Sequence, residues 1–353
     1  MEKIFPRKIP CPALDIGARE IKFVSLGAGR DSADIKAVAR YPTPPDIFSD
    51  GINEDTLGAI LEKLVEQYAP GGTGLVSIIG GDNVVTRYIT LPGMPSRELK
   101  KAVLLEAQRV MPVSPEELVV RYITLGNITG ENNKQQELIF AAVPRVLTYR
   151  YHAMFERAGL ALTALDLPAI ALWRLYRKEL SREERPAAII DIGEAKTNLV
   201  ICRRGKIKYI RTLPVGGYLL TKSMADTYGL DFKKARTLKE EEGAILNEED
   251  LAGAGAARIQ MDFSLRDGLG KLVKEIRRSL EFYSTMNGNA PVAKIMLSGG
   301  TSKLRGFDIF TSEALDLPAQ VVIPSSINFE DSGYYAFDPS LAVAYGLALR
   351  EVQ

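Results

Sequence analysis

Residues 187–200, which read AAIIDIGEAKTNLV, decide the fold of this chain. An apolar run ends at Asp191, the chain turns at Gly193, and a second apolar run begins near Asn198. Short apolar runs on both sides of a glycine turn predict two paired strands. The glycine lets backbone N–H groups close around an anion, and an adjacent aspartate can hold a hydrated metal ion.

The same motif occurs once more near the start of the chain. Residues 12–17 read PALDIG, and a second apolar run, IKFVSL, follows at residues 21–26. Asp15 and Gly17 therefore repeat the aspartate and glycine of the later turn. Because an internal repeat indicates a repeated structural unit, we expect two similar domains. Two such turns facing each other would hold a triphosphate and its magnesium ion from both sides.

The composition is that of an ordinary globular protein and excludes several classes. The 353 residues suffice for two domains of roughly 150 residues each. A formal net charge of +1 provides no general attraction to nucleic acid or acidic lipid. No apolar run reaches the ~18–20 residues of a membrane span, and two isolated cysteines fit a reducing compartment, so we expect a cytoplasmic protein. The sequence has no P-loop motif, and the single histidine, His152, makes histidine-centred catalysis a poor choice.

Proline and charge patterns predict the domain organisation. We expect a first domain over 1–92, an inserted subdomain over 93–166, a connecting helix and linker over 167–185, and a second domain over 186–353 with its own insertion at about 232–268.

Three further expectations concern single segments of the chain. The stretch from Ser96 to Arg109 predicts a helix with Ser96 as its N-cap. Residues 246–261 are rich in alanine, glycine and acids, and predict an exposed excursion. A long amphipathic helix is expected from Gly268 to Tyr283.

The order of these elements resembles that of the actin-like ATPases. Two strand–Asp-x-Gly–strand units are followed by a long helix and by a strand that ends in Gly299-Gly300. The resemblance implies an α/β protein with two RNase H-like domains that face a central nucleotide cleft. The inserted subdomain would be placed as in the FtsA branch.

Four stretches are similar to the PilM family, the actin-like proteins of type IV pilus assembly. They are residues 85–95 (VTRYITLPGMP), 110–117 (VMPVSPEE), 275–283 (EIRRSLEFY) and 297–306 (LSGGTSKLRG). The resemblance covers about residues 12–350.

This resemblance implies that ATP or ADP binds with magnesium. The first phosphate loop would comprise Asp15, Gly17, Ala18, Arg19, Glu20 and Lys22, and the second Asp191, Gly193, Glu194, Ala195, Lys196 and Thr197. Gly299, Gly300 and Thr301, together with Ser298, would form the adenosine loop. Glu275, Arg278 and Ser279 on the preceding helix would border the adenine and ribose. Lys239 and Arg236 on the charged helix 231–241 are further candidates. Asp15 and Asp191 would hold magnesium mainly through its water molecules. A solvated lysine at a strand end is the alternative for Lys22, and a solvated helix face is the alternative for Glu275, Arg278 and Ser279.

The chain departs from the actin-like pattern where hydrolysis needs a polar group. Relatives carry Glu or Gln at the start of the connecting helix to position the attacking water. Aligning Pro168 with them puts Leu167 at that site and Asp166 one residue early. An apolar side chain cannot orient water by hydrogen bonding. We therefore expect at most a weak ATPase, with no confident catalytic residue apart from Asp191 as a candidate.

The resemblance also implies the partners. PilM-like proteins bind the cytoplasmic N-terminal peptide of the membrane protein PilN in a groove beside the inserted subdomain. The residues at that groove would be Arg87, Ile89, Leu91, Pro92, Met94 and Leu99. The chain would then be peripheral to the inner membrane through its partners, meet the pilus motor and platform proteins, and form a homo-oligomeric ring.

Two other functions of the same fold stay open at this point. A small-molecule kinase would need a second substrate pocket with a catalytic carboxylate, for which the sequence offers no convincing residue. A polymerising protein like FtsA or MreB would pellet with ATP. A scaffold without nucleotide is disfavoured, because it would have no physical need for both aspartates and both glycine turns.

Overall fold

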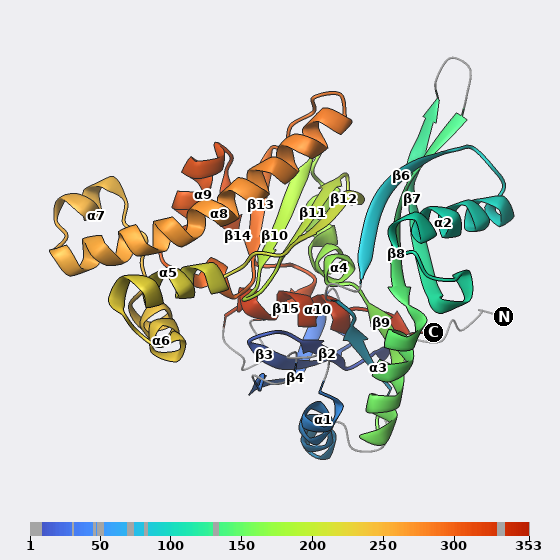
Figure 1. The fold of residues 1–353 in the computed structure, drawn as a ribbon, viewed down its shortest axis with the longest axis horizontal. Coiled ribbons are helices and arrows are strands. Elements are labelled where there is room, and N and C mark those ends of the chain that lie inside the picture. The colour runs from blue at the N-terminus through green and yellow to red at the C-terminus, as the bar shows by residue number, and fades with distance from the viewer. Residues whose placement is uncertain are drawn as a thin grey trace.

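The computed structural model describes residues 9–29, 32–44, 47, 53–68, 74–80, 84–129, 134–329 and 336–352. Two sheets within these residues share one topology (Figure 1). Their strand orders are β4-β3-β2-β5-β9, with β15 added beside β4, and β12-β11-β10-β13-β14. In both, the first three strands are antiparallel and the last two run parallel to the central one. The repeated turn of the sequence therefore belongs to a repeated sheet.

The strands of the two sheets have the following bounds. The first sheet contains β2 (Ala13–Ile16), β3 (Glu20–Gly27), β4 (Ala33–Pro42), β5 (Leu75–Ile78), β9 (Leu162–Asp166) and β15 (Ile327–Asn328). The second contains β10 (Ala187–Ile192), β11 (Thr197–Arg203), β12 (Lys206–Leu213), β13 (Lys294–Ser298) and β14 (Ala319–Val321).

Two helices pack against each other between the sheets, as Figure 1 shows. They are α4 (Pro168–Ser181), which lies on the second sheet, and α10 (Ala342–Ala348), which lies on the first. Every residue of α10 is buried. A Cβ atom on Gly346 would overlap the carbonyl of Ala171, so only glycine permits this close approach. One apolar core therefore joins the two halves.

Other helices cover the outer faces of the sheets. On the first sheet these are α1 (Glu54–Tyr68) and α3 (Arg145–Arg157), and on the second α5 (Tyr218–Tyr228), α8 (Ala256–Met286) and α9 (Phe307–Leu315). Helices α6 (Phe232–Glu242) and α7 (Glu248–Ala252) complete the second half. Short 3-10 turns lie at η1 (Pro115–Glu117), η2 (Gly300–Lys303) and η3 (Pro339–Leu341).

The inserted unit is a three-stranded sheet with a helix on one face (Figure 1). Its strands are β6 (Val85–Pro92), β8 (Lys134–Pro144) and β7 (Leu118–Thr129), and its helix is α2 (Ser96–Val110). Strand β6, assigned to the first domain from sequence, pairs with β8, whereas β9, assigned to the insert, pairs with β5 of the first sheet. Strand pairing between distant segments decides this, and apolar patterns do not encode it.

One helix expectation was wrong. Pro95, with ψ of 150°, is the N-cap of α2, its carbonyl accepts the first helical N–H bonds, and Ser96 is the first helical residue. Residues 246–261 are mostly exposed, as expected, and they are largely helical, because α7 lies within them and α8 already begins at Ala256. The buried carboxylate of Asp262 accepts the N–H of Leu246 and pairs with Arg266. A buried polar network of this kind holds a segment that apolar periodicity does not reveal.

The ends of the described chain meet. Strand β1 (Ile9–Pro10) pairs antiparallel with β16 (Glu351–Val352). Among the described residues, no helix has both the length and the apolar character needed to cross a lipid bilayer.

Candidate functional site

The first Asp-Ile-Gly turn joins β2 to β3. The N–H of Gly17 donates to the carbonyl of Glu20 at 3.0 Å, and a Cβ atom on Gly17 would lie 2.9 Å from that oxygen. Asp15 lies directly opposite Lys22 in the hairpin, and the Lys22 ammonium is 3.4 Å from a carboxylate oxygen of Asp15. Both side chains are largely buried.

The second turn, between β10 and β11, repeats this geometry. The N–H of Gly193 donates to the carbonyl of Lys196, also at 3.0 Å. Asp191 lies opposite Asn198, whose amide donates to a carboxylate oxygen of Asp191 at 3.2 Å. Asn198 was missed as a site residue. Its signal was its position, because it follows Asp191 by the interval that separates Lys22 from Asp15.

The electrostatics show that the two turns lie close together. Burial raises the pKa of Asp191 to about 6, and the hydrogen bond from Asn198 opposes this. The positive charge of Lys22 also lowers the pKa of Asp191, while the negative charge of Asp15 raises it. The charged groups of the first predicted phosphate loop are therefore near enough to Asp191 of the second to change its pKa.

A third loop, at Gly216-Gly217, packs on the second turn. The N–H groups of Gly217 and Tyr218 each donate at 2.8 Å, to the carbonyls of Gly193 and Glu194. A Cβ atom on Gly216 would lie only 2.5 Å from the carbonyl oxygen of Gly193. The sequence analysis gave this loop no role, although two adjacent glycines after a strand are a recognisable signal for close backbone approach.

The predicted adenosine loop follows β13 and borders the same turn. Ser298 lies beside Asp191 in the parallel pair of β10 and β13. Gly299 has φ of +86°, and a Cβ atom there would overlap the backbone of Ile192, so this position requires glycine. The hydroxyl of Thr301 would lie 2.6 Å from a Cβ atom on Gly217. The adenosine loop therefore reaches the Gly216-Gly217 loop.

Helix α6 brings two cations to the second turn. Arg236 pairs with the carboxylate of Glu194 at 2.9 Å, and the Lys239 ammonium lies 4.0 Å from the other oxygen of Glu194. Lys239 also donates to the hydroxyl of Thr221 at 2.7 Å and to the carbonyl of Gly217 at 3.3 Å. Burial lowers the pKa of Lys239. These contacts place Lys239 among the predicted loops.

The remaining predicted residues of the loops have structural contacts or lie at the turn tips. Thr197 donates its hydroxyl proton to the carbonyl of Val215 at 2.8 Å, which orients the strand after the turn. Arg19 pairs with Glu240 of α6 at 3.3 Å, so it links the first turn to the second half. Ala18 and Ala195 lie within the two turns.

Glu275, Arg278 and Ser279 are not brought to these loops by any contact within the described residues. Arg278 is exposed and pairs with Glu275 at 2.9 Å along α8. Ser279 is fully buried, where its hydroxyl donates to the carbonyl of Glu275 and accepts from Arg211 of β12. Their assignment to the adenosine site stays a prediction.

Asp166 is held by structural contacts. One carboxylate oxygen accepts the N–H of Leu167 at 2.9 Å, and the other accepts from Arg174 at 2.8 Å and from Arg350 at 2.7 Å. The side chain is buried. These three donors occupy both oxygens, which leaves Asp166 poorly suited to position an attacking water.

The six predicted partner residues fall into two groups. Leu99 is buried in the core of the inserted unit, and Ile89, Leu91 and Met94 pack against that core half-buried. Arg87 and Pro92 are exposed. The two exposed residues can contact a peptide directly, whereas Leu99 supports the shape of the surface from inside.

The donors present fit a magnesium nucleotide. The described residues hold no cluster of three or more His, Cys, Asp or Glu side chains suited to a metal. Magnesium is usually held by one or two carboxylates together with water and phosphate oxygens, so Asp15 and Asp191 match its requirements. A Cβ atom on Gly17 or Gly193 would crowd a carbonyl of its own turn, so glycine keeps both turns tight, and Lys22 and Lys239 provide positive charge.

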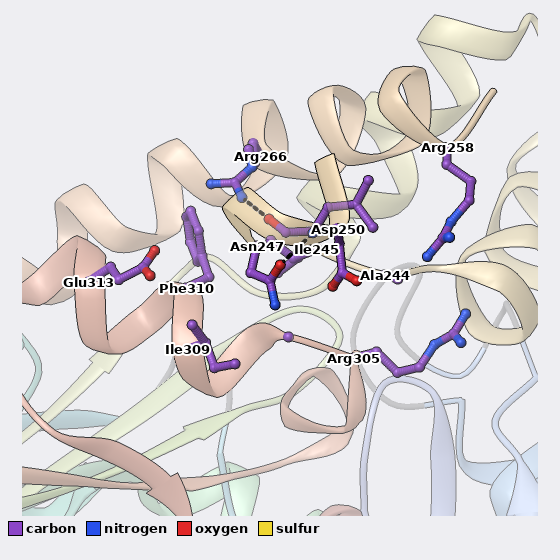
Figure 2. A pocket seen from close by; sticks show the side chains of 12 residues that line it. Ala244, Ile245, Asn247, Asp250, Arg258, Arg266, Arg305, Ile309, Phe310 and Glu313 are labelled. Carbon is purple, nitrogen blue, oxygen red and sulfur yellow. Dashed lines mark hydrogen bonds between the residues drawn. The ribbon is translucent and has the colours of Figure 1, made fainter. Parts of the chain in front are cut away.

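A separate hollow of about 230 Å³ lies between α7, α8 and α9 (Figure 2). Arg266 stands at this hollow and is neutralised by Asp262. Arg305 and Ala244, which also line it, form a parallel bridge that joins the segment after α6 to the segment after the adenosine loop.

Comparison with known proteins gives one family and one fold. A family model described as type IV pilus assembly protein PilM matches residues 13–352. A chain of a PilM-PilN type IV pilus biogenesis complex matches with a TM-score of 0.81 and 27% identity, covering 97% of this chain and 98% of that one. MreB5 of Spiroplasma citri, in a structure bound to AMPPNP, matches with a TM-score of 0.52 and 13% identity over 97% of this chain and 95% of its own. The actin-like ATPase fold expected from the sequence is confirmed.

Among curated sequences, cell division protein FtsA of Borreliella burgdorferi is 23% identical over 241 residues, which is 63% of this chain and 53% of FtsA. The chain spans about half the length of the curated relatives it matches.

Proposed function

Because the chain belongs to the type IV pilus assembly protein PilM family, we propose that it is an ATP-binding cytoplasmic adaptor of the pilus assembly complex. In this role it binds the N-terminal cytoplasmic peptide of PilN and links it to the motor and platform proteins. ATP or ADP is held with magnesium and is hydrolysed slowly or not at all. The protein is peripheral to the inner membrane through these partners and assembles into a homo-oligomeric ring.

The observation that supports the nucleotide part is that charged groups of the first turn affect Asp191 in the second. Lys22 and Asp15 of the first half act electrostatically on Asp191 of the second half. A ligand bound there contacts both halves at once, so it stabilises one relative arrangement of the two by mass action. This effect requires binding alone. The tight contacts of Asp166 and the apolar Leu167 support slow turnover.

In this proposal the turns and strand ends hold the nucleotide. Asp15 and Asp191 orient the water shell of magnesium, which neutralises phosphate charge when bound. Lys22 and the backbone N–H groups of the turns bind the phosphates. Gly299 and Gly300 lack side chains, which lets the purine lie against the backbone.

The PilN part is supported by the family and by the solved complex of a PilM with PilN. An extended peptide that lies along a strand edge or in a helix-lined groove is a common mode of capture. Here the exposed Arg87 and Pro92 on β6 are the residues best placed to meet it.

A calorimetric titration of the purified full chain with Mg-ATP, with and without a synthetic PilN N-terminal peptide, tests both parts. We expect both to bind, and we expect Asp191→Ala to abolish the ATP signal. Asp226→Ala on the exposed surface of α5 is the matched control and should bind ATP normally. Folded, nucleotide-free protein that does not bind ATP would overturn the nucleotide assignment, and ATP binding without peptide binding would overturn the adaptor role.

A further inference from the structure

The second sheet carries an excess of positive charge at the end opposite the nucleotide turns. Asp191 and Ser298 lie near the ends of β10 and β13, whereas the linker 182–186 and the tip of the β11–β12 hairpin lie where β10 begins. The last turn of α4 reaches the same place. We call basic end the exposed cations of these three elements that form no ion pair with an acid among the described residues: Arg177, Arg182, Arg185, Arg203 and Lys206.

Hydrogen bonds hold the three elements of the basic end together. The N–H of Gly205, at the hairpin tip, donates to the carbonyl of Leu180 in α4 at 2.9 Å. The indole N–H of Trp173 donates to the carbonyl of Gly205 at 2.8 Å. Arg203 donates from Nε to the carbonyl of Glu184 in the linker at 2.9 Å. The cations of the basic end therefore belong to one surface with a fixed backbone.

The neighbouring acids do not balance this charge. Glu184 pairs with Arg204 at 3.2 Å, and Glu183 pairs with Lys294. Both acids thus already have a cation outside the basic end. The whole chain has a formal net charge of only +1, so the basic end is a local excess, and the acids that offset it lie elsewhere in the chain.

A structural role explains only some of these cations. The C-terminus of a helix carries partial negative charge, so Arg177 and Arg182 stabilise the end of α4. Arg185, Arg203 and Lys206 lie outside that helix. Their charges repel one another across the short distance between linker and hairpin, and an anionic partner would relieve this repulsion.

Exposed apolar side chains lie beside the basic end, on the last turns of α8. Phe282 is 50% exposed and Met286 is 37% exposed. The ring of Phe282 lies 5.9 Å from that of Tyr209 on β12, measured between centroids. Burial raises the pKa of Tyr283, and the positive charge of Arg203 opposes this, so the end of α8 is within electrostatic reach of the hairpin tip. Cations next to exposed aromatic and aliphatic side chains are typical of surfaces that bind a lipid interface.

The elements at the basic end favour a lipid surface over a peptide or a small anion. A peptide is captured in a groove or along a strand edge, and a hairpin tip beside a helix end provides neither. None of the five cations lines the hollow shown in Figure 2. Anionic headgroups, in contrast, form an extended layer that needs only exposed cations to bind.

We propose that the basic end, with Phe282 and Met286 beside it, docks on an anionic lipid surface. The inference goes beyond the proposed function, in which partners alone hold the protein at the membrane. Headgroup phosphates contact the five cations, and the apolar side chains enter the headgroup layer. Each cation close to such a surface strengthens binding roughly fivefold, and salt screens this attraction.

The test is co-sedimentation of the full chain with vesicles of phosphatidylcholine alone and of phosphatidylcholine mixed with phosphatidylglycerol. We expect binding to the mixed vesicles only, and we expect high salt to release most of the protein. The double variant Arg185→Gln, Lys206→Gln should weaken binding by roughly 25-fold, because two cations are lost. Neither side chain forms a hydrogen bond or ion pair among the described residues, so the fold should be unchanged, which circular dichroism verifies.

The matched control is the double variant Lys63→Gln, Lys271→Gln, which removes the same charge from exposed positions on α1 and α8. It should bind the mixed vesicles like the wild type. Phe282→Ala should weaken binding several-fold, because an exposed ring no longer enters the headgroup layer.

The inference fails if the wild type does not bind the mixed vesicles, or if the control loses as much binding as the variant of the basic end. Binding to duplex DNA at a salt concentration that releases the vesicles would assign the basic end to nucleic acid and overturn the lipid assignment. The titrations with Mg-ATP and with the PilN peptide are independent of these results, so the proposed function can stand while this inference fails.

Discussion

Lys22 and Asn198 occupy the same position in two repeated hairpins. Each follows its aspartate by seven residues and lies directly opposite it, Lys22 across from Asp15 and Asn198 across from Asp191. The first aspartate is therefore paired with a cation, while the second is paired with a neutral amide. This difference leaves Asp191 as the carboxylate whose charge is poorly compensated without a ligand, and several predictions depend on it.

Asp191→Asn should stabilise the ligand-free protein near neutral pH. The pKa of Asp191 is raised from 3.8 to about 6, so between these pH values the folded state holds a proton that the unfolded state has lost. Stability then falls as pH rises from about 4 to 6, by roughly 2–3 kcal/mol. Urea unfolding at several pH values should show a gain in Asp191→Asn at pH 7–8 that vanishes near pH 4. An equal gain at pH 4 would contradict this explanation.

Lys22→Met should weaken Mg-ATP binding by roughly tenfold to a hundredfold, the loss expected for a charged hydrogen bond to phosphate. Lys22 is largely buried beside Asp15 and acts on Asp191. Lys36→Met removes an exposed lysine from the same sheet and is the control. Titration calorimetry measures the Mg-ATP affinity of both variants. If Lys22→Met binds Mg-ATP as tightly as the wild type, Lys22 is an ordinary solvated lysine at a strand end.

Asp166→Asn should destabilise the protein by about 2–4 kcal/mol, because it leaves Arg174 and Arg350 without their shared carboxylate. It should not change the rate of phosphate release from ATP, which we expect to be slow in the wild type. Chemical unfolding and a phosphate-release assay measure the two effects. Asp55→Asn, at an exposed acid paired with Arg157, should alter neither. A large fall in turnover with an intact fold would instead give Asp166 a catalytic role.

Asp338 should contribute stability that is lost in acid. Hydrogen bonds from Ser340 and Arg40 outweigh burial and hold the pKa of Asp338 well below its usual range. Arg40 lies on β4 and Lys303 lies at the end of η2, and both pair with Asp338. The folded pKa is depressed, so the contribution is present above about pH 4 and fades as pH falls below it. Asp338→Asn should cost about 1–2 kcal/mol at pH 7, and urea unfolding should show a smaller cost at pH 3 than at pH 7, because part of the contribution is lost below the unfolded pKa.

Leu99→Ala should destabilise the inserted unit by about 2–4 kcal/mol, as expected for truncating a buried leucine. Leu99 is 5% exposed in the core formed by α2 and the small sheet. Arg87→Glu, in contrast, should reduce affinity for the PilN peptide without a change in stability, because Arg87 is exposed. Denaturation and peptide titration on both variants separate the two roles. A stable Leu99→Ala with lost peptide binding would show that Leu99 contacts the peptide.

Sequence alone determined the repeated unit. The alternation of apolar runs with Asp-Ile-Gly predicted both hairpins. The glycine of each turn and the distance along the chain from Asp15 to Lys22 are local properties, so they can be read from the sequence. The amphipathic face of α8 was also predictable, because a period of 3.6 residues is visible within one segment.

Only the tertiary structure decided which segments meet. The pairing of β6 with β8 and of β9 with β5, the ion pair of Glu194 with Arg236, and the capture of Asp166 by Arg350 join residues far apart in the chain. Charged residues at such contacts look like solvated ones in a linear pattern, since their partners are not sequence neighbours. These distant contacts change what the side chains do: burial raises the pKa of Asp191, Arg236 balances the charge of Glu194, and Arg350 helps to hold the carboxylate of Asp166.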